Sequence, residues 1–178
     1  AYSQSRNDKY YVIDLSSFSG NLATIMNNFL VSEGSNYRLV RGTTTKTHIY
    51  SVLAKVELRQ ISGNTSTFIG YYDSLKSVSQ KLSDYGSGDF KVKILVSSLT
   101  ETSGFGVWDI NVILVSAVDT IVNFNLSNTG SCIVLESEGG LTIGGTASGE
   151  SGLITIKASN FTEIISCGQT MSDLVINN

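Results

Sequence analysis

The sequence predicts a mainly β fold, an antiparallel β-sandwich or barrel with one amphipathic helix near residues 17–32 and one short helix near 74–85. Apolar and polar residues alternate with period two over most of the chain, which is typical of strands that bury one face. Turn sequences such as Ser62-Gly63-Asn64 and Asn128-Thr129-Gly130 interrupt the alternation at short intervals. The length of 178 residues fits one domain, so we expect a single β-rich domain over 1–178.

The first elements are a strand over residues 10–15 and the longer helix. The helix is indicated by apolar residues at three- and four-residue spacing, namely Phe18, Leu22, Ile25, Met26, Phe29 and Leu30. A shorter stripe of the same spacing, Leu75, Val78, Leu82 and Tyr85, predicts the second helix. Asp73 or Ser74 can cap its start, and Gly86 ends it.

The remaining segments predict strands. From His48 to Gln60 the alternation indicates one long strand with Val52, Ala54 and Val56 on its buried face. Residues 90–96 repeat this pattern, and 107–117 and 118–126 are apolar on both faces, as in a central or covered strand. Segments near 131–136, 152–158 and 162–167 continue the series, and the glycine-rich stretch 138–152 predicts a loop or hairpin. The similarity of 140–143 to 152–156 gives too few copies to establish a repeat.

The sequence offers little for catalysis or cofactor binding. Its single histidine, His48, has no nucleophile motif beside it, so we interpret it as an ordinary strand-end residue rather than a catalytic base. The stretch Gly139–Gly145 lacks the Gly-Lys-Ser/Thr ending of a phosphate loop. The oxygen clusters Asp84–Asp89 and Glu136/Glu138 are too sparse for a calcium cage. We therefore expect no enzyme, no cofactor and no metal.

The aromatic and sulfur-containing residues have a structural and a functional interpretation. Phe68, Tyr71 and Tyr72, and also Phe105 and Trp108, are expected to be core or interface anchors, with a sugar-stacking platform as the alternative. Trp108 is in phase with Ile110, which favours the core. Cys132 and Cys167 permit one disulfide, but both lie in apolar runs, so two buried free thiols are expected.

Charge is distributed unevenly along the chain. Residues 1–93 have a net charge of +4 and residues 94–178 a net charge of −7, within an overall charge of −3. This split arises either from two layers of one fold or from a positive face of one copy meeting a negative face of the next. The scattered basic residues do not favour nucleic acid, and no apolar run is long enough to cross a membrane.

Together these features favour a non-enzymatic, self-assembling structural protein of a virus particle, such as a subunit of a phage tail, fibre or capsid surface. The expected partners are further copies of the chain and other virion proteins, and the expected location is the virion. Proline, a common guard of strand edges, is absent from the sequence, which is consistent with edges that are used for pairing. The alternative is an extracellular or cell-surface module that binds a carbohydrate or a receptor.

Overall fold

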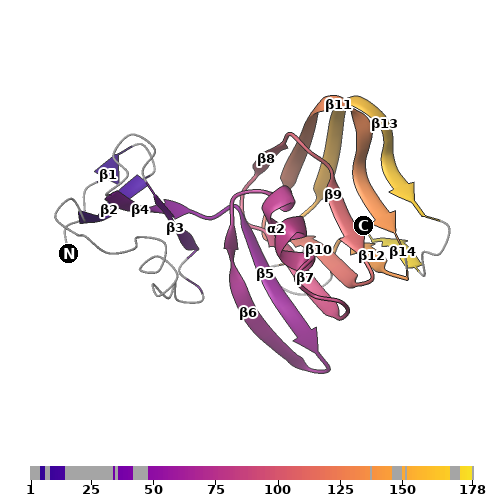
Figure 1. The fold of residues 1–178 in the computed structure, drawn as a ribbon, viewed down its shortest axis with the longest axis horizontal. Helices are drawn as coiled ribbons and strands as arrows, with labels where there is room; N and C mark the ends of the chain where they lie inside the picture. The colour runs from indigo at the N-terminus through magenta and orange to yellow at the C-terminus, as the bar shows by residue number, and fades with distance from the viewer. Residues whose placement is uncertain are drawn as a thin grey trace. The chain divides into compact units, whose positions relative to one another are not determined.

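The protein is described by a computed structural model that covers residues 5–6, 9–14, 34, 36–41, 48–136, 138–145, 150, 152–168 and 173–177 (Figure 1). The chain divides into two compact units, residues 1–54 and 55–178. The mainly β prediction is confirmed, with several sheets and one helix in the described part of the chain. The expectation of a single β-rich domain over 1–178 stays a prediction.

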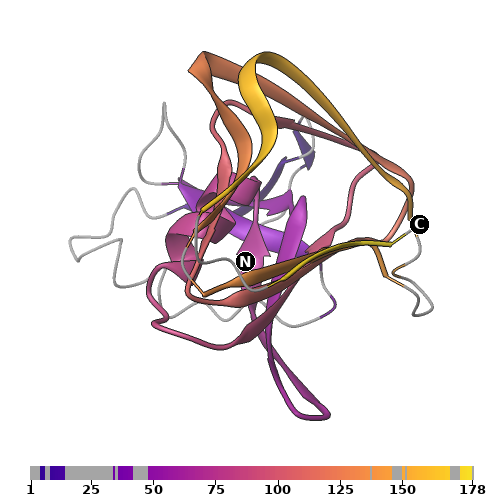
Figure 2. The same cartoon turned by 90° about the vertical axis from the view of Figure 1, so that its right-hand side faces the viewer.

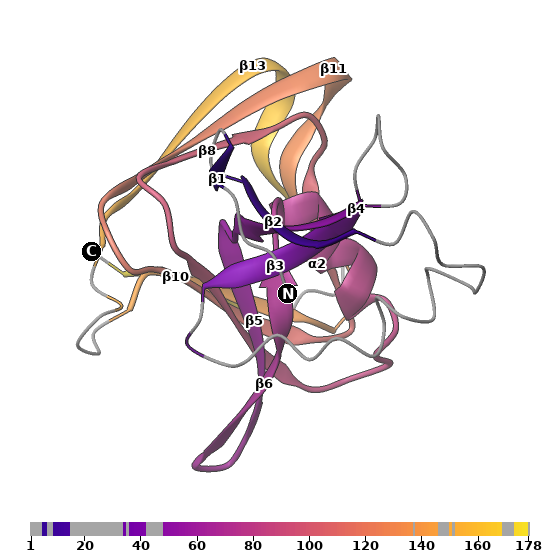
Figure 3. The same cartoon turned by 90° about the vertical axis from the view of Figure 1, so that its left-hand side faces the viewer.

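The first unit contains a four-stranded antiparallel sheet, visible in Figure 3. Its strands are β1 (Ser5–Arg6), β2 (Lys9–Asp14), β3 (Tyr37–Arg41) and β4 (His48–Leu53), in the order β1-β2-β4-β3. The strand predicted over 10–15 is confirmed as β2. The helix predicted near 17–32 lies outside the described residues.

The second unit begins with an antiparallel hairpin and a helix and continues as a series of short strands. The hairpin and helix are β5 (Val56–Ser62), β6 (Thr65–Tyr72) and α2 (Leu75–Leu82). The strands that follow are β7 (Asp89–Ile94), β8 (Ser98–Glu101), β9 (Phe105–Trp108), β10 (Asn111–Ser116), β11 (Thr120–Glu136), β12 (Gly140–Ile143), β13 (Ile154–Cys167) and β14 (Asp173–Ile176).

These later strands form stacked coils rather than hairpins. Each coil has three sides, with a strand on each. On the first side β7, β10, β12 and β14 pair in parallel. On the second side β8 pairs with the first half of β11, which pairs with β13. On the third side β9 pairs with the second half of β11, which again pairs with β13. The chain therefore winds as a parallel β-helix, and Figure 2 shows its three sides enclosing the core.

Equivalent inward side chains of successive coils form the core of this unit. Phe90, Val112 and Leu141 occupy one column, and each has almost no exposed surface. Leu99 and Val122 stack on the second side, as do Phe105 and Ile133 on the third. Because each coil covers the apolar residues of the one before it, burial is continuous along the stack.

The predicted antiparallel sandwich or barrel is wrong for this unit. In it, antiparallel pairing is confined, among the described strands, to β5 with β6 and with β7. Parallel and antiparallel strands show the same alternation when one face is buried, so the pattern does not distinguish them. Only three residues join β7 to β8, and a turn of that length resembles a hairpin in the sequence although it is the corner of a coil.

The predicted strand from His48 to Gln60 is two strands, β4 and β5. The Ala54 N–H donates to the Asn36 carbonyl at 2.8 Å, whereas the Lys55 N–H donates to the Tyr72 carbonyl at 2.9 Å. The chain thus changes hydrogen-bond partners between two adjacent residues without interrupting the alternation of side chains. The strand predicted over 107–117 is also divided, because Asp109 adopts a left-handed conformation with φ of 55° between β9 and β10.

The helix predicted near 74–85 is confirmed as α2. The Ser74 side chain accepts a hydrogen bond from the Ser77 N–H at 3.1 Å and so caps its first turn. Part of the predicted 138–152 loop is ordered differently, because residues 140–143 form β12 within the first stack.

Candidate functional site

Three carboxylates of the oxygen clusters that the sequence analysis judged too sparse for calcium accept hydrogen bonds from other side chains. The Asp84 carboxylate accepts from the Lys81 ammonium at 2.8 Å, which raises the pKa of Lys81, and the Asp89 carboxylate accepts from the Asn111 amide at 2.8 Å. The Glu136 carboxylate accepts from the Trp108 indole N–H at 3.0 Å. Within the described ranges, no three side chains of His, Cys, Asp or Glu gather in a group that could hold a metal ion.

The structure places His48 and the two cysteines on strands. His48 is the first residue of β4 and lies opposite Asp14 in the register of the sheet. Cys132 and Cys167 are both free; burial raises the pKa of the Cys132 thiol, and Cys167 is exposed at the end of β13. The prediction of two buried thiols is correct for Cys132 and wrong for Cys167, which lies on the last strand of its stack.

Trp108 lies on the outer surface of the β-helix. Its side chain is 42% exposed, so the prediction that it belongs to the core is wrong, whereas Phe105 is fully buried. The left-handed Asp109 breaks the alternation between Trp108 and Ile110. The indole lies over Gly106, where any Cβ atom would overlap the ring. The Glu136 carboxylate and the Gly106 backbone therefore hold an aromatic ring in place at the surface.

One end of the coil stack is closed by α2 and the β5–β6 hairpin. β5 pairs with the outer edge of β7, and Leu75, Val78 and Leu82 of α2 are buried in the core cluster. The Ser79 hydroxyl accepts from the Gly106 N–H at 3.0 Å and donates to the Gly106 carbonyl at 3.1 Å, which satisfies the edge of β9. We call β5, β6 and α2 the capped end.

A buried carboxylate fixes the start of the capping helix. Glu101, the last residue of β8, is 1% exposed and accepts from the backbone N–H of Leu75 at 2.6 Å and of Lys76 at 3.4 Å. Burial raises the pKa of Glu101 more than these two hydrogen bonds lower it. The group joins a strand to a helix N-terminus and has no second titratable partner in hydrogen-bond contact among the described residues, so its role is structural.

Among the described residues, the other end of the stack has no cover comparable to α2. β13 and β14 are the outermost strands of their stacks, and we call these two strands, with the adjoining Leu153 and Asn177, the open end. Inward residues of this end, such as Ile156 and Leu174, are only half buried, unlike their neighbours Val122 and Leu141 in the preceding coil. Five of the large apolar side chains exposed in the described part of the chain lie here: Leu153, Phe161, Ile164, Val175 and Ile176.

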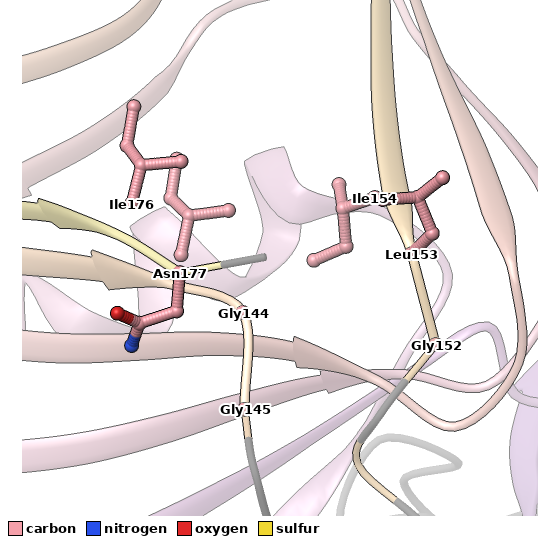
Figure 4. A pocket seen from close by; sticks show the side chains of 8 residues that line it. Gly144, Gly145, Gly152, Leu153, Ile154, Ile176 and Asn177 are labelled. Carbon is pink, nitrogen blue, oxygen red and sulfur yellow. The ribbon is translucent and has the colours of Figure 1, made fainter.

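A cavity of about 410 Å³ opens between the two strands at this end. Figure 4 shows Leu153 and Ile154 on one side of it and Ile176 with Asn177 on the other. The glycine-rich segment beside it is tied to the first coil, because the Glu150 carboxylate accepts from the Lys91 ammonium at 2.9 Å. The lining is mainly aliphatic and backbone, which suits apolar contact rather than acid–base chemistry.

Comparison with known protein families, with curated proteins and with solved structures found no match for this chain. None of the helices in the described residues has the length and apolar character that crossing a membrane requires. The open end, with its exposed apolar side chains, and the exposed Trp108 are the two surface features on which a functional proposal can rest. Sequence reasoning missed the open end because alternation shows which face of a strand is apolar, not whether another strand covers its edge.

Proposed function

We propose that this chain is a non-enzymatic structural protein that assembles with further copies of itself in a virus particle, as a subunit of a tail, fibre or capsid surface. The open end of the β-helix is the observation that supports this proposal. Within the part of the chain that the structure describes, β13 and β14 have no strand beyond them, and their half-covered aliphatic side chains suit contact with another chain.

Energetic considerations support assembly at this end. Exposed edges and clustered apolar residues are normally blocked in monomeric proteins by charge, proline or a covering element. The capped end has such cover in α2, and the same chain lacks it at β13 and β14 among the described residues. Burial of side chains such as Ile176, which is 67% exposed, would supply most of the affinity of an assembled state.

Sedimentation velocity over a range of protein concentrations tests the proposal. The unmodified chain is expected to form oligomers, and Ile176→Lys is expected to shift them toward monomers because an ammonium cannot be buried in an apolar contact. Ile113→Lys is the matched control, since Ile113 is also exposed but lies on β10, which is paired on both sides. A chain that stays monomeric at high concentration, or equal effects of the two substitutions, would contradict the proposal.

The virion location rests on this assembly behaviour and on the absence of a catalytic motif in the sequence. Labelling of purified particles with an antibody against the chain tests it directly. Localisation to a regular feature of the particle is expected, and its absence from particles would leave assembly in place but remove the virion role.

A second candidate function is carbohydrate binding, which the exposure of Trp108 favours. The indole is held at the surface by Glu136, and the face of such a ring can stack on the apolar face of a pyranose. Trp108 is the only tryptophan, so its fluorescence reports on any ligand that covers it. A glycan array followed by fluorescence titration tests this function: binding lost in Trp108→Ala and kept in Phe161→Ala would support it, and an array without hits would contradict it.

A further inference from the structure

The Trp108 indole has a fixed orientation on the outer surface of the β-helix. A Cβ atom at Gly106 would overlap three atoms of the six-membered ring, so the ring lies directly across the backbone of β9. One face of the indole is therefore turned toward the strand, and the other is turned away from it. Since 42% of the side chain is exposed, this outer side suits contact with a flat ligand.

A carboxylate borders the same ring. Glu136 lies directly opposite Trp108 in the register of β11 with β9, and both side chains are exposed. The Glu136 Oε2 atom accepts from the indole N–H at 3.0 Å, so the carboxylate stands at the edge of the ring rather than over its face. A ligand wide enough to cover the ring therefore also comes close to Glu136.

The strands around this ring carry acidic charges without basic ones. Residues 102–118 and 120–149, which include β9 to β12, contain three charged residues, and all three are acids: Asp109, Glu136 and Glu138. Asp109 directly follows Trp108 and is exposed, as is Glu138. A Cβ atom at Gly139 would lie 3.3 Å from the Asp109 backbone nitrogen, so the two turns that carry these acids lie side by side. Negative charge is thus concentrated at the corner of the coil where Trp108 lies.

We propose that Trp108 and Glu136 form a sugar-binding site that selects neutral pyranoses over acidic ones, with Glu136 as the residue that sets this preference. The inference rests on the second candidate function, carbohydrate binding, and names the class of sugar. Stacking on the indole uses the C–H face of a pyranose, which neutral and acidic sugars share, so Trp108 alone does not distinguish them. The Glu136 carboxylate accepts hydrogen bonds from sugar hydroxyl groups but repels the carboxylate of a uronic or sialic acid.

The size of the expected preference follows from the repulsion between like charges. Two like charges about 4 Å apart in water repel strongly enough to weaken binding about fivefold, and the effect is larger where the ligand excludes water. Asp109 and Glu138 add to the repulsion from a greater distance. We therefore expect acidic glycans to bind at least fivefold more weakly, as an order of magnitude, than neutral glycans of the same linkage.

A glycan array that carries neutral, uronic and sialylated glycans tests the preference. The unmodified chain is expected to bind neutral glycans. Titration of Trp108 fluorescence with a neutral hit and with its uronic counterpart, such as a glucoside and the glucuronide of the same linkage, gives the ratio of the two dissociation constants. Glu136→Gln keeps a side-chain oxygen for the indole N–H and removes the charge, so this ratio should fall about fivefold or more. Glu163→Gln, which removes an exposed carboxylate on β13, is the matched control and should leave the ratio unchanged.

Two further variants test the site itself, and the outcomes separate the preference from the function on which it rests. Gly106→Ala displaces the indole while Trp108 remains in the chain, and Trp108→Ala removes it, so both should lose the neutral glycans. Full binding by either variant would overturn the site. Acidic glycans that bind the unmodified chain as well as neutral ones, or a ratio that Glu136→Gln leaves unchanged, would overturn the preference but leave carbohydrate binding intact. An array without hits of any kind would contradict both proposals.

Discussion

At the scale of single residues, Glu101 shows how a charged side chain can be part of a core. It follows Leu99 at the next inward position of β8, where alternation alone predicts an apolar residue. The structure explains the exception, because the carboxylate takes the two free N–H groups at the start of α2. The sequence shows the exception but not its partner, since 26 positions separate Leu75 from Glu101.

Replacement of Glu101 should destabilise the fold in a way that depends on the substituent. Glu101→Ala leaves the two helix N–H groups without an acceptor and should cost about 1–3 kcal/mol in the free energy of unfolding. Glu101→Gln keeps one oxygen toward Leu75 and should cost less. Urea unfolding of the three proteins at neutral pH measures the difference, and equal stabilities would contradict the assigned role.

The same residue predicts a dependence of stability on pH. Because the pKa of Glu101 is raised in the folded state, folding favours the protonated form, whose contribution is complete below the ordinary value of 4.5. That contribution is lost as the pH rises through the raised pKa. The difference in unfolding free energy between the native chain and Glu101→Gln should therefore change with pH in this window, and a constant difference would contradict the prediction.

At the scale of elements, the sequence predicts strands and the short helix more successfully than it predicts their pairing. The inward positions of β7, β10 and β12 are all apolar, yet Asp89, Asn111 and Gly140, which lie in register, are separated by different lengths of chain. Unequal coils conceal the repeat that a regular spacing would reveal. The similarity between 140–143 and 152–156 joins strands of different stacks, so it does not mark equivalent positions.

The capping helix offers a test of what closes the stack. Leu82 is 2% exposed in the core cluster, so Leu82→Ala should cost about 2–5 kcal/mol. Gln80 lies on the exposed side of the same helix, and Gln80→Ala should change stability by less than about 0.5 kcal/mol. Thermal or urea unfolding compares the two, and a small loss in Leu82→Ala would mean that α2 does not support the coils.

At the scale of the whole molecule, the sequence predicts the strand content well and the arrangement of the strands poorly. The mainly β content follows from alternation, which is local. The β-helix depends on which strands meet after a full coil, and no local signal specifies that.

The uneven charge along the chain predicts how salt affects assembly. Charges at physiological ionic strength are screened beyond about 8 Å, so added salt should slow the association of residues 1–93 of one copy, which are net positive, with residues 94–178 of the next, which are net negative. Dissociation should change less, because apolar burial holds the contact once it forms. Light-scattering time courses at several salt concentrations measure both rates. If the association rate does not change with salt, the uneven charge would instead reflect two differently charged layers of one fold.

The contrast between the two ends of the β-helix also has a consequence for local unfolding. A stack in which each coil contacts only its neighbours opens most easily from the end that has a neighbour on one side. Amide hydrogens of β14 and β13 should therefore exchange with solvent fastest, those of β12 and β11 more slowly, and those of β7 slowest. If an oligomer forms through the open end, the amide hydrogens of β14 and β13 should become slower to exchange than in the monomer. The strand whose exchange slows is then the strand that a partner has covered.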